Sequence, residues 1–359
     1  MASESVVDIQ GKRLKLSNLE KVLYPAVGFT KGQVIDYFVR ISPVLLPHLK
    51  GRPLTLKRYP NGVNGMFFYE KNCPEHRPEW VQVAPVWSAG NNKWMNYCLA
   101  QDLPTLVWAA NLADLELHTS LSVAKDVLRP TFIVFDLDPG EPANIVQCCQ
   151  VGLWVRGVFS QLGLESFAKT SGSKGLQIYV PLNTPATYDE TKPFAHELAR
   201  LLERQHRDLV VSDMKKTLRV GKILVDWSQN DDHKTTICVY SLRAKERPTV
   251  STPVTWDEVE NCLAKKDPNL LVFDSAQVLE RVKQYGDLFE PVLKLKQKLP
   301  PIEALADLDP AAEVSPKPAK RTAAARERQT VMGAKKSAPP TRAAKSKRKT
   351  ASRPKQKRA

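Results

Sequence analysis

The segment Thr131-Phe-Ile-Val-Phe-Asp-Leu-Asp-Pro-Gly140 carries the strongest structural signal in the chain. Its apolar run, residues 132–135, predicts a strand that is buried on both faces. Side chains alternate along a strand, so Asp136 and Asp138 share one face and the apolar residues beside them take the other. Pro139-Gly140 supplies turn chemistry that ends the strand. We therefore expect a buried strand that points two carboxylates at one place.

Two neighbouring carboxylates repel each other, and a divalent cation between them removes that repulsion. A second segment of the same form, Lys222-Ile-Leu-Val-Asp226, also ends in an acid. Phosphoryl transfer uses such a set with two cations, one activating the attacking oxygen and the other steadying the leaving pyrophosphate. The hypothesis is a two-cation site at Asp136, Asp138 and Asp226. The alternative is a set of solvated strand ends.

A glycine-punctuated turn, Ser171-Gly-Ser-Lys-Gly175, follows between two predicted strands. Gly172 and Gly175 let the backbone approach an anion closely, backbone amides can face phosphate oxygens, and Lys174 adds a charge. The spacing is not that of a Walker loop. An ordinary hairpin fits the same residues, but the position after an acidic strand favours phosphate binding.

Single basic residues give weaker indications of a phosphate site. His118 follows an apolar segment and is either a structural histidine or a phosphate contact. Lys234 and Arg243 flank the strand that follows Asp226, where a solvated surface charge is the alternative role.

The N-terminal third holds candidates for contact with nucleic acid. Phe67-Phe68 adjoins a Gly/Asn turn, and two adjacent aromatics cannot both face the core of a strand, so one is available to stack on a base. Lys21 and Lys31 lie on segments expected to be basic helices. Exposed helix charges are the alternative role for these two lysines.

Composition indicates an intracellular protein with a polyanionic partner. The 359 residues are 42% apolar and 25% charged, with a net charge of +15 and a pI of about 9.5, which favours nucleic acid or an anionic surface as partner. No apolar run approaches twenty residues, and the first ten residues lack an apolar h-region, so neither a membrane span nor secretion is expected. The six cysteines form no CxxC pair, so we expect no disulfide scaffold, and a cytoplasmic location fits. Cys73 and His76 have ligand-like spacing, but no second pair accompanies them to make a zinc site.

The C-terminal segment, residues 301–359, has a different composition from the rest of the chain. It holds sixteen Lys plus Arg and five Asp plus Glu, a net charge of +11, in an Ala/Pro/Lys-rich context. Such a segment cannot build a core, so we expect a disordered basic tail. It is either a solubilising tail or a flexible arm that neutralises DNA phosphates.

Periodicity and turn signals predict a mixed order of helices and strands. Helices are expected over residues 17–24, from 30 to an end region between 43 and 51, and over 102–112, 145–162, 192–206, 256–263 and 275–285. Strands are expected over 53–59, 66–69, twice within 80–99, and over 166–170, 176–181, 222–226 and 235–240. Several strands follow one another directly, so we expect an α/β (α+β) fold with an antiparallel or mixed sheet.

The motifs together resemble the polymerase domain of bacterial DNA ligase D, a branch of the archaeo-eukaryotic primase superfamily. The resemblance covers roughly residues 10–290 and rests on several segments: Leu16-Ser-Asn-Leu-Glu-Lys-Val-Leu-Tyr-Pro25, Gly51-Arg-Pro53, Lys57-Arg-Tyr-Pro-Asn-Gly62, Phe67-Phe68-Tyr-Glu-Lys71, Val134-Phe-Asp-Leu-Asp-Pro-Gly140, Thr170-Ser-Gly-Ser-Lys-Gly-Leu176, Val225-Asp-Trp-Ser-Gln-Asn230, Tyr240-Ser-Leu-Arg243 and Pro248-Thr-Val250. No ligase or nuclease segment follows them, so the expectation is a stand-alone relative.

The resemblance implies a primase-like catalytic core with an RRM-type sheet and a packed N-terminal α/β layer. In this scheme residues 1–300 form the primase-polymerase domain, with an N-terminal DNA-end-binding layer over about 1–115 and the catalytic core over about 116–300. The implied activity is template-dependent addition of NTPs or dNTPs during gap filling or end joining, with Mn²⁺ or Mg²⁺ as cofactor. The implied partners are gapped or end-processed DNA with a 5′-phosphate, Ku and a DNA ligase, in the bacterial nucleoid.

The resemblance also assigns roles to individual residues. Asp136, Asp138 and Asp226 would be the metal ligands. The incoming triphosphate would be held by Ser171, Lys174, His118, Lys234 and Arg243, with Lys57 near its sugar or phosphates. Lys21 and Lys31 would take the 5′-phosphate of a downstream strand, with Phe67 and Phe68 stacking near the template base.

One position departs from the family pattern. The family usually has histidine where this chain has Gln177. An amide donates to a phosphate oxygen but carries no charge and shuttles no proton. We expect weaker nucleotide binding or a changed rate, with the fold retained.

Two other functions fit part of the sequence. A haloacid-dehalogenase-type phosphatase shares the Phe-Asp-Leu-Asp motif, but Pro139-Gly140 follows it here and no later GDxxxD occurs. A non-catalytic DNA-end binder would treat Gln177 as decay of the site, although all three aspartates are retained.

Overall fold

The computed structural model describes residues 4–88, 92–306 and 308 of the chain. Nearly all of the predicted basic tail, and the tip of the predicted turn near residue 90, lie outside the described residues. Among the described residues no helix is both long and apolar enough to cross a membrane.

The strand predicted around Asp136 lies inside a six-stranded sheet, named here the β12 sheet. Its neighbours all run antiparallel except for one parallel pair at the edge, between the first two strands. The strand order is β15 (Val210–Val211), β16 (Ile223–Asp226), β12 (Phe132–Pro139), β14 (Leu176–Pro181), β13 (Phe167–Thr170) and β18 (Pro253–Val254). The sheet is therefore mixed and mainly antiparallel, as expected from the order of elements.

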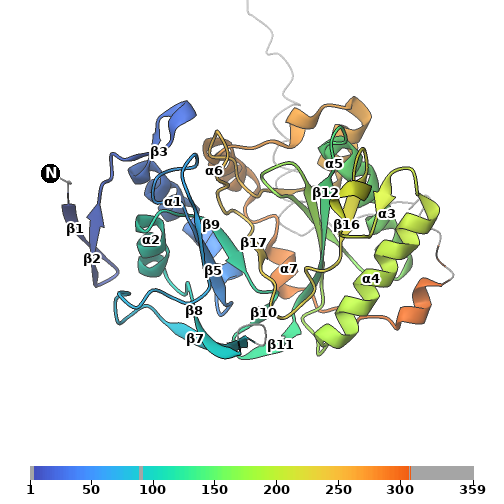
Figure 1. The fold of residues 1–359 in the computed structure, drawn as a ribbon, viewed down its shortest axis with the longest axis horizontal. Coiled ribbons are helices and arrows are strands. Elements are labelled where there is room, and N and C mark those ends of the chain that lie inside the picture. The colour runs from blue at the N-terminus through green and yellow to red at the C-terminus, as the bar shows by residue number, and fades with distance from the viewer. Residues whose placement is uncertain (1–3, 89–91, 307, 309–359) are drawn as a thin grey trace, which may run out of the picture. The chain divides into compact units, whose positions relative to one another are not determined.

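The two faces of β12 belong to two different cores. Phe135 and Leu137 pack with helices α3 (Ile145–Gln161) and α4 (Tyr188–Gln205), which lie on one side of the sheet in Figure 1. Val134 faces the other way, into a core shared with the second sheet. The alternation predicted from the sequence is confirmed, since apolar side chains fill one face and the aspartates extend the other.

A second six-stranded sheet, the β9 sheet, is built from the N-terminal half of the chain and one late strand. Its strands are β17 (Thr236–Ile237), β9 (Asp114–Thr119), β5 (Leu54–Arg58), β8 (Lys93–Cys98), β7 (Val83–Ser88) and β6 (Phe68–Glu70), the last of which pairs with β5. Helices α1 (Lys31–Leu49) and α2 (Leu103–Asn111) pack against each other and share its core. The late strand β17 therefore brings residues near 236 beside β9.

Shorter elements complete the described chain. They are β1 (Glu4–Ile9), β2 (Lys12–Ser17), β3 (Val22–Tyr24), η1 (Pro25–Val27), β4 (Phe29–Thr30), β10 (Ser122–Val123), β11 (Asp126–Pro130), η3 (Lys216–Leu218), α5 (Trp256–Lys265), η4 (Pro268–Leu271), α6 (Ser275–Tyr285), α7 (Glu290–Lys294) and η5 (Ile302–Leu305). Leu305 is buried in the core behind the β12 sheet, so packed structure continues past Pro300.

The short helix predicted over residues 17–24 is wrong. The chain forms strands on either side of a turn there, and Asn18 has a φ of 55°, which a right-handed helix does not allow. Ser17 donates its backbone N–H to Asn111 Oδ1 of α2 instead of capping a helix. A contact between segments distant in sequence has overridden a local capping signal.

The predicted helix that starts at Thr30 is confirmed, and it ends at Leu49, within the predicted end region between residues 43 and 51. Thr30 and Gln33 form a capping box, with each side chain bonded to the other residue's backbone. The helix continues past Pro43 to Leu49, because buried residues such as Leu45 extend its apolar face beyond that proline. The helix predicted from Lys192 begins at Tyr188 in the structure.

The cysteines include one bridged pair. Cys73 and Cys98 form a disulfide that joins the segment after β6 to the end of β8. The other four, Cys148, Cys149, Cys238 and Cys262, are buried free thiols. No sequence motif paired these cysteines, and this bridge forms because the two residues, 25 positions apart in the chain, meet where the segment after β6 lies beside β8.

Candidate active site

Three predicted carboxylates lie on one face of the paired strands β12 and β16. Asp136 on β12 lies directly opposite Asp226 on β16 in the antiparallel ladder, and directly opposite side chains share a face. Burial, and next the charge of Asp226, raise the pKa of Asp136 to about 6. A buried carboxylate forced against a like charge is the environment that a divalent cation stabilises. The donor set consists of hard oxygens and fits Mn²⁺ or Mg²⁺.

Cations and hydrogen-bond donors surround two of these carboxylates. Asp138 lies 3.8 Å from Lys174 Nζ and 3.4 Å from a guanidinium nitrogen of Arg219. Asp226 accepts hydrogen bonds at Oδ1 from the backbone and hydroxyl of Ser228, at 2.8 and 2.7 Å, and at Oδ2 from Gln229. Asp138 therefore already contacts positive charge, and Asp226 is held in one orientation.

The predicted glycine turn packs tightly between β13 and β14. A Cβ on Gly175 would lie 2.3 Å from the carbonyl oxygen of Leu137, and Gly172 has a φ of +68°, so both positions require glycine. Ser171 Oγ accepts from the backbone N–H groups of Ser173 and Gly175, at 3.2 and 3.1 Å. Two of the amides expected to face a phosphate are therefore bonded within the turn, and Ser171 fixes its shape.

An open pocket of about 270 Å³ lies between the two sheets and is named here the interlayer pocket. It collects six of the predicted site residues, namely His118, Asp136, Asp138, Ser171, Lys174 and Arg243. Gln177, Thr235 and Thr236 also line it. The pocket therefore has an acidic wall from β12 and a basic wall from the glycine turn, His118 on β9 and the segment after β17.

Glu116 on β9 organises the basic residues of this region, although no sequence motif indicated a role for it. Its carboxylate lies 3.0 Å from Lys57 Nζ, 3.1 Å from His118 Nε2 and 3.2 Å from Arg243 Nε, and it also accepts the backbone N–H of Ala244. Burial would raise the pKa of Glu116, but the hydrogen bond with His118 and the charge of Arg243 hold it well below its usual value. The i, i+2 spacing of Glu116 and His118 on one strand was the available signal.

Lys57 connects this cluster to the exposed aromatic residues at β6. Its ammonium lies 4.7 Å from the ring centre of Phe67 and 5.2 Å from that of Tyr69. Phe67 and Phe68 are 48% and 49% exposed, so both present part of a ring to solvent. Tyr69 in turn meets His118 edge to face at 6.0 Å, so the aromatic group adjoins the interlayer pocket.

Lys21 and Lys31 lie close together at the start of α1. The backbone N–H of Lys31 bonds the carbonyl of Lys21 at 2.8 Å. Lys31 is buried and donates to the carbonyl of Ser17, while Lys21 reaches Asn61 Oδ1. Burial, then repulsion from Lys21 and Arg58, lower the pKa of Lys31 to about 8. The two predicted phosphate ligands therefore form one positive site.

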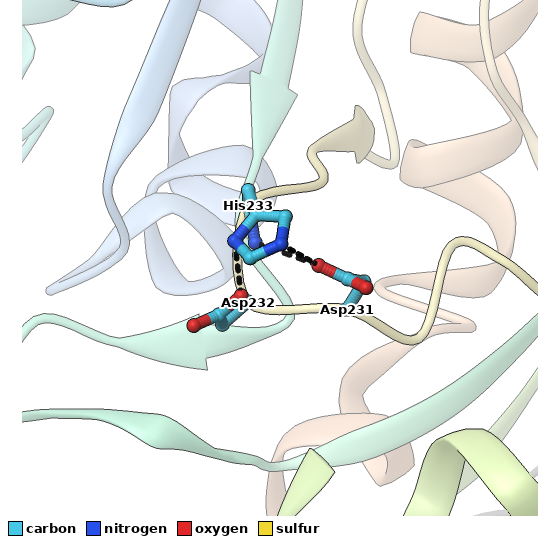
Figure 2. A group of neighbouring side chains, drawn as sticks. All are labelled: Asp231, Asp232 and His233. Atoms are coloured by element: carbon cyan, nitrogen blue, oxygen red, sulfur yellow. Dashed lines mark hydrogen bonds and ion pairs between the residues drawn. The ribbon is translucent and has the colours of Figure 1, made fainter. Parts of the chain in front are cut away.

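Lys234 lies on an exposed turn and is not among the residues that line the interlayer pocket. Beside it, the His233 ring lies between Asp231 and Asp232, as Figure 2 shows. Among the described residues, this is the one group of three His, Cys, Asp or Glu side chains whose possible metal-ligand atoms all lie within 4.8 Å of one another. Asp231 also pairs with Lys192 at 2.5 Å. The side chains of these three residues contact one another, and the backbone N–H of His233 donates to Asp231, so the group holds the turn that carries Lys234.

Residues 30–289 match the family model described as the LigD primase-polymerase domain. The chain belongs to this family. Its members are nucleotidyltransferases, and they generally need divalent metals. The phosphatase interpretation of the Phe-Asp-Leu-Asp motif is therefore set aside, and the family suggested by the sequence motifs is confirmed.

Relatives of this LigD family chain share its sequence over most of its length. It is 39% identical over 316 residues to the multifunctional non-homologous end joining protein LigD of Mycolicibacterium smegmatis, covering 87% of this chain and 40% of the relative. It is 40% identical over 287 residues to LigD of Mycobacterium tuberculosis, and the match covers 78% of this chain and 37% of the relative. The chain therefore spans about two fifths of the length of these curated relatives.

A solved structure matches the fold. The polymerase domain of Mycobacterium tuberculosis ligase D, in complex with DNA, superposes with a TM-score of 0.73 at 38% identity, covering 79% of this chain and 99% of that chain. The predicted primase-like α/β architecture of the LigD family is thereby confirmed.

Proposed function

We propose that the chain is a DNA-dependent primase-polymerase that adds NTPs or dNTPs to primer ends during gap filling or end-joining repair. The observation that carries this proposal is the opposed pair Asp136 and Asp226, beside a pocket that also collects basic residues. An acidic wall can bind metal ions and a basic wall beside it can bind phosphates, so the pocket suits a nucleoside triphosphate bound together with metal ions.

The acidic wall would hold the metal ions. Asp136, Asp138 and Asp226 are the proposed ligands, with Mn²⁺ or Mg²⁺ as the cofactor, bound in pairs as other two-metal phosphoryl-transfer enzymes bind them. The cations supply charge neutralisation and orientation of the reacting oxygens. The protein contributes a rigid sheet that fixes the carboxylates before substrate arrives.

The basic wall would hold the triphosphate. Ser171, Lys174, His118 and Arg243 line the pocket. Lys57, which pairs with Glu116, and the exposed Lys234, which precedes the pocket residue Thr235, are the further proposed contacts. Arg243 is anchored by Glu116 and by the carbonyl of Ser171, so its guanidinium is oriented without a ligand. Preorganised cations stabilise developing phosphate charge without reorganising during the reaction.

The N-terminal layer would hold the DNA. Lys21 and Lys31 are the proposed ligands of a 5′-phosphate on a downstream strand, through charge-assisted hydrogen bonds. Phe67 and Phe68 offer partly exposed rings for stacking near the template base. Gapped or end-processed DNA is the proposed substrate, with Ku and a DNA ligase as the proposed protein partners.

Primer extension on gapped DNA with Mn²⁺ and NTPs tests the proposal. The wild type should incorporate nucleotides, and the Asp136→Ala/Asp138→Ala double variant should lose at least roughly a hundredfold in rate, since metal-ion catalysis contributes several kcal/mol. Asp257→Asn, which removes one exposed carboxylate on α5, is the matched control and should keep the wild-type rate. Equal incorporation by the wild type and the double variant would refute the proposal. DNA binding by a wild type that incorporates nothing would favour a non-catalytic end binder.

A further inference from the structure

Four polar side chains form one row across the β12 sheet. Asp226 faces Asp136, Asp136 faces Gln177, and Gln177 faces Lys169, each pair directly opposite on adjacent antiparallel strands. Opposite residues project from the same face, so the row runs from the proposed metal ligands to a lysine two strands away.

Lys169 is a fully buried cation at the end of this row, with 0% of its surface exposed. Its ammonium donates to Gln177 Oε1 and to Ser251 Oγ, each at 2.6 Å, and lies 5.4 Å from the ring centre of Tyr179. Burial lowers the pKa of Lys169 to about 7. A buried amine of this kind is costly to place in a core, and no sequence motif indicated a role for Lys169.

The lysine fixes which way the Gln177 amide points. Lys169 donates to Oε1 of Gln177, so the NH₂ group of the amide faces the pocket. That NH₂ group donates to Thr236 Oγ1 at 3.2 Å, and its hydrogen bond to Asp136 opposes the rise in the pKa of that carboxyl. A reversed amide would bring its carbonyl oxygen against the carboxylate of Asp136.

The same amide connects the two walls of the interlayer pocket. Thr236 belongs to β17 of the β9 sheet, where its neighbour Ile237 pairs with His118. The bond between Gln177 and Thr236 therefore ties the strand beside Asp136 to the strand beside His118. A change in the Gln177 orientation would disturb both the acidic wall and the basic wall.

We propose that Lys169 is a positioning residue for nucleotidyl transfer, which locks the Gln177 amide so that its NH₂ group orients Asp136 and joins the two pocket walls. This inference rests on the proposed function. Lys169 touches neither substrate nor metal ligand directly in this scheme, and it acts through Gln177.

Lys169→Met tests the inference, because methionine keeps the length of the side chain and removes its donors. Steady-state primer extension should show kcat reduced roughly tenfold or more, with the KM for nucleotide within about threefold of the wild type. The Tm should stay equal or rise, because a buried cation is replaced by an apolar side chain of similar volume. Arg156→Met removes a charge from α3, which packs on the other face of the sheet, and should leave kcat unchanged.

A double-variant cycle separates positioning from general damage. Gln177→Leu alone should lower kcat to a similar extent, and Lys169→Met/Gln177→Leu should be no slower than the slower single variant, because both changes break one chain of contacts. If Lys169→Met does not fold, Gln177→Leu decides, and a wild-type kcat there overturns the inference. A wild-type kcat in folded Lys169→Met, or additive losses in the double variant, also overturns it. An inactive wild type would refute the proposed function and this inference with it.

Discussion

Asp136 on β12 and Asp226 on β16 stand directly opposite each other in one antiparallel ladder, although ninety residues separate them in the chain. Like charges in this arrangement destabilise a sheet, and burial increases the penalty. Without a bound cation, the repulsion between Asp136 and Asp226 therefore lowers the free energy of unfolding.

Removing one of these charges should stabilise the metal-free protein. The pKa of Asp136 is raised to about 6, so the ionised form costs roughly 3 kcal/mol at pH 7 relative to an ordinary aspartate. A raised carboxyl pKa means that the folded state binds the extra proton, so this group's contribution is favourable at low pH and is lost as pH rises through 6. In a chelator, Asp136→Asn should raise the Tm at pH 7 by several degrees and reduce the loss of stability between pH 4 and 6.

Adding Mn²⁺ supplies the complementary measurement for this pair. A cation that binds only the folded state should raise the Tm of the wild type and leave Asp136→Asn nearly unchanged. Asp257→Asn should respond to Mn²⁺ as the wild type does. An Asp136→Asn protein that is less stable than the wild type in chelator would contradict the proposed repulsion.

Neutralising Glu116 should have the opposite effect on stability. Glu116→Gln leaves the half-buried cations of Lys57 and Arg243 without their counter-charge, a loss of roughly 3–5 kcal/mol for a broken buried pair. Since the pKa of Glu116 is depressed, its contribution is present above about pH 4.5 and disappears as pH falls. Differential scanning fluorimetry at pH 7 should show a Tm lower by roughly 5–10 °C.

A triphosphate should restore part of the stability lost in Glu116→Gln, because it supplies negative charge to the same cations. Glu70→Gln is the matched control, since Glu70 pairs with Arg58 but is 31% exposed, and its loss should be within about 1 kcal/mol. Equal Tm values for Glu116→Gln and the wild type would show that Glu116 does not organise the basic wall.

Recognition of a DNA 5′-phosphate should depend on pH through Lys31. With a pKa of about 8, Lys31 is mostly charged at pH 7 and mostly neutral at pH 9. The affinity ratio of 5′-phosphorylated to 5′-hydroxyl gapped DNA should therefore fall as pH rises over this range. Lys31→Ala should lower the ratio roughly tenfold at pH 7, the usual size of one charge-assisted contact.

Lys31→Arg separates charge from shape at this site. A guanidinium stays protonated throughout the range, so the ratio should lose its pH dependence. Fluorescence anisotropy measures the affinity of the wild type, Lys31→Ala, Lys31→Arg and Lys21→Ala for the phosphorylated and the hydroxyl-ended DNA. If Lys21→Ala and Lys31→Ala both leave the phosphate preference intact, the assignment of this site is wrong.

Removing the basic C-terminal segment should flatten the salt dependence of DNA binding. The deletion should begin after Leu308, because Leu305 is buried in the core. Residues 309–359 hold sixteen Lys plus Arg, and the slope of log K against log salt should fall by roughly one unit for each phosphate they neutralise. A full-length variant with these residues changed to Gln tests charge at constant length, and an unchanged slope in both would make the segment a spacer.

Local rules were sufficient for much of the fold and for the acidic strand. Alternation along 132–138 correctly placed Asp136 and Asp138 on one face, and apolar residues at helical spacing after Thr30 correctly predicted α1. The same rules failed at residues 17–24, where contact with α2 decided the structure. A capping signal contributes only about 1 kcal/mol, and tertiary contacts readily exceed it.

The amino-acid sequence by itself determined the family of this protein, the two-faced strand that ends in carboxylates and the glycine turn, because strand alternation and glycine geometry act over a few residues. Only the tertiary structure decided three contacts. Glu116 pairs with three basic side chains, Arg219 pairs with Asp138, and Lys169 donates a hydrogen bond to Gln177. These relationships join strands and turns that are far apart in the chain. Their geometry follows from sheet order and register, which no local pattern encodes.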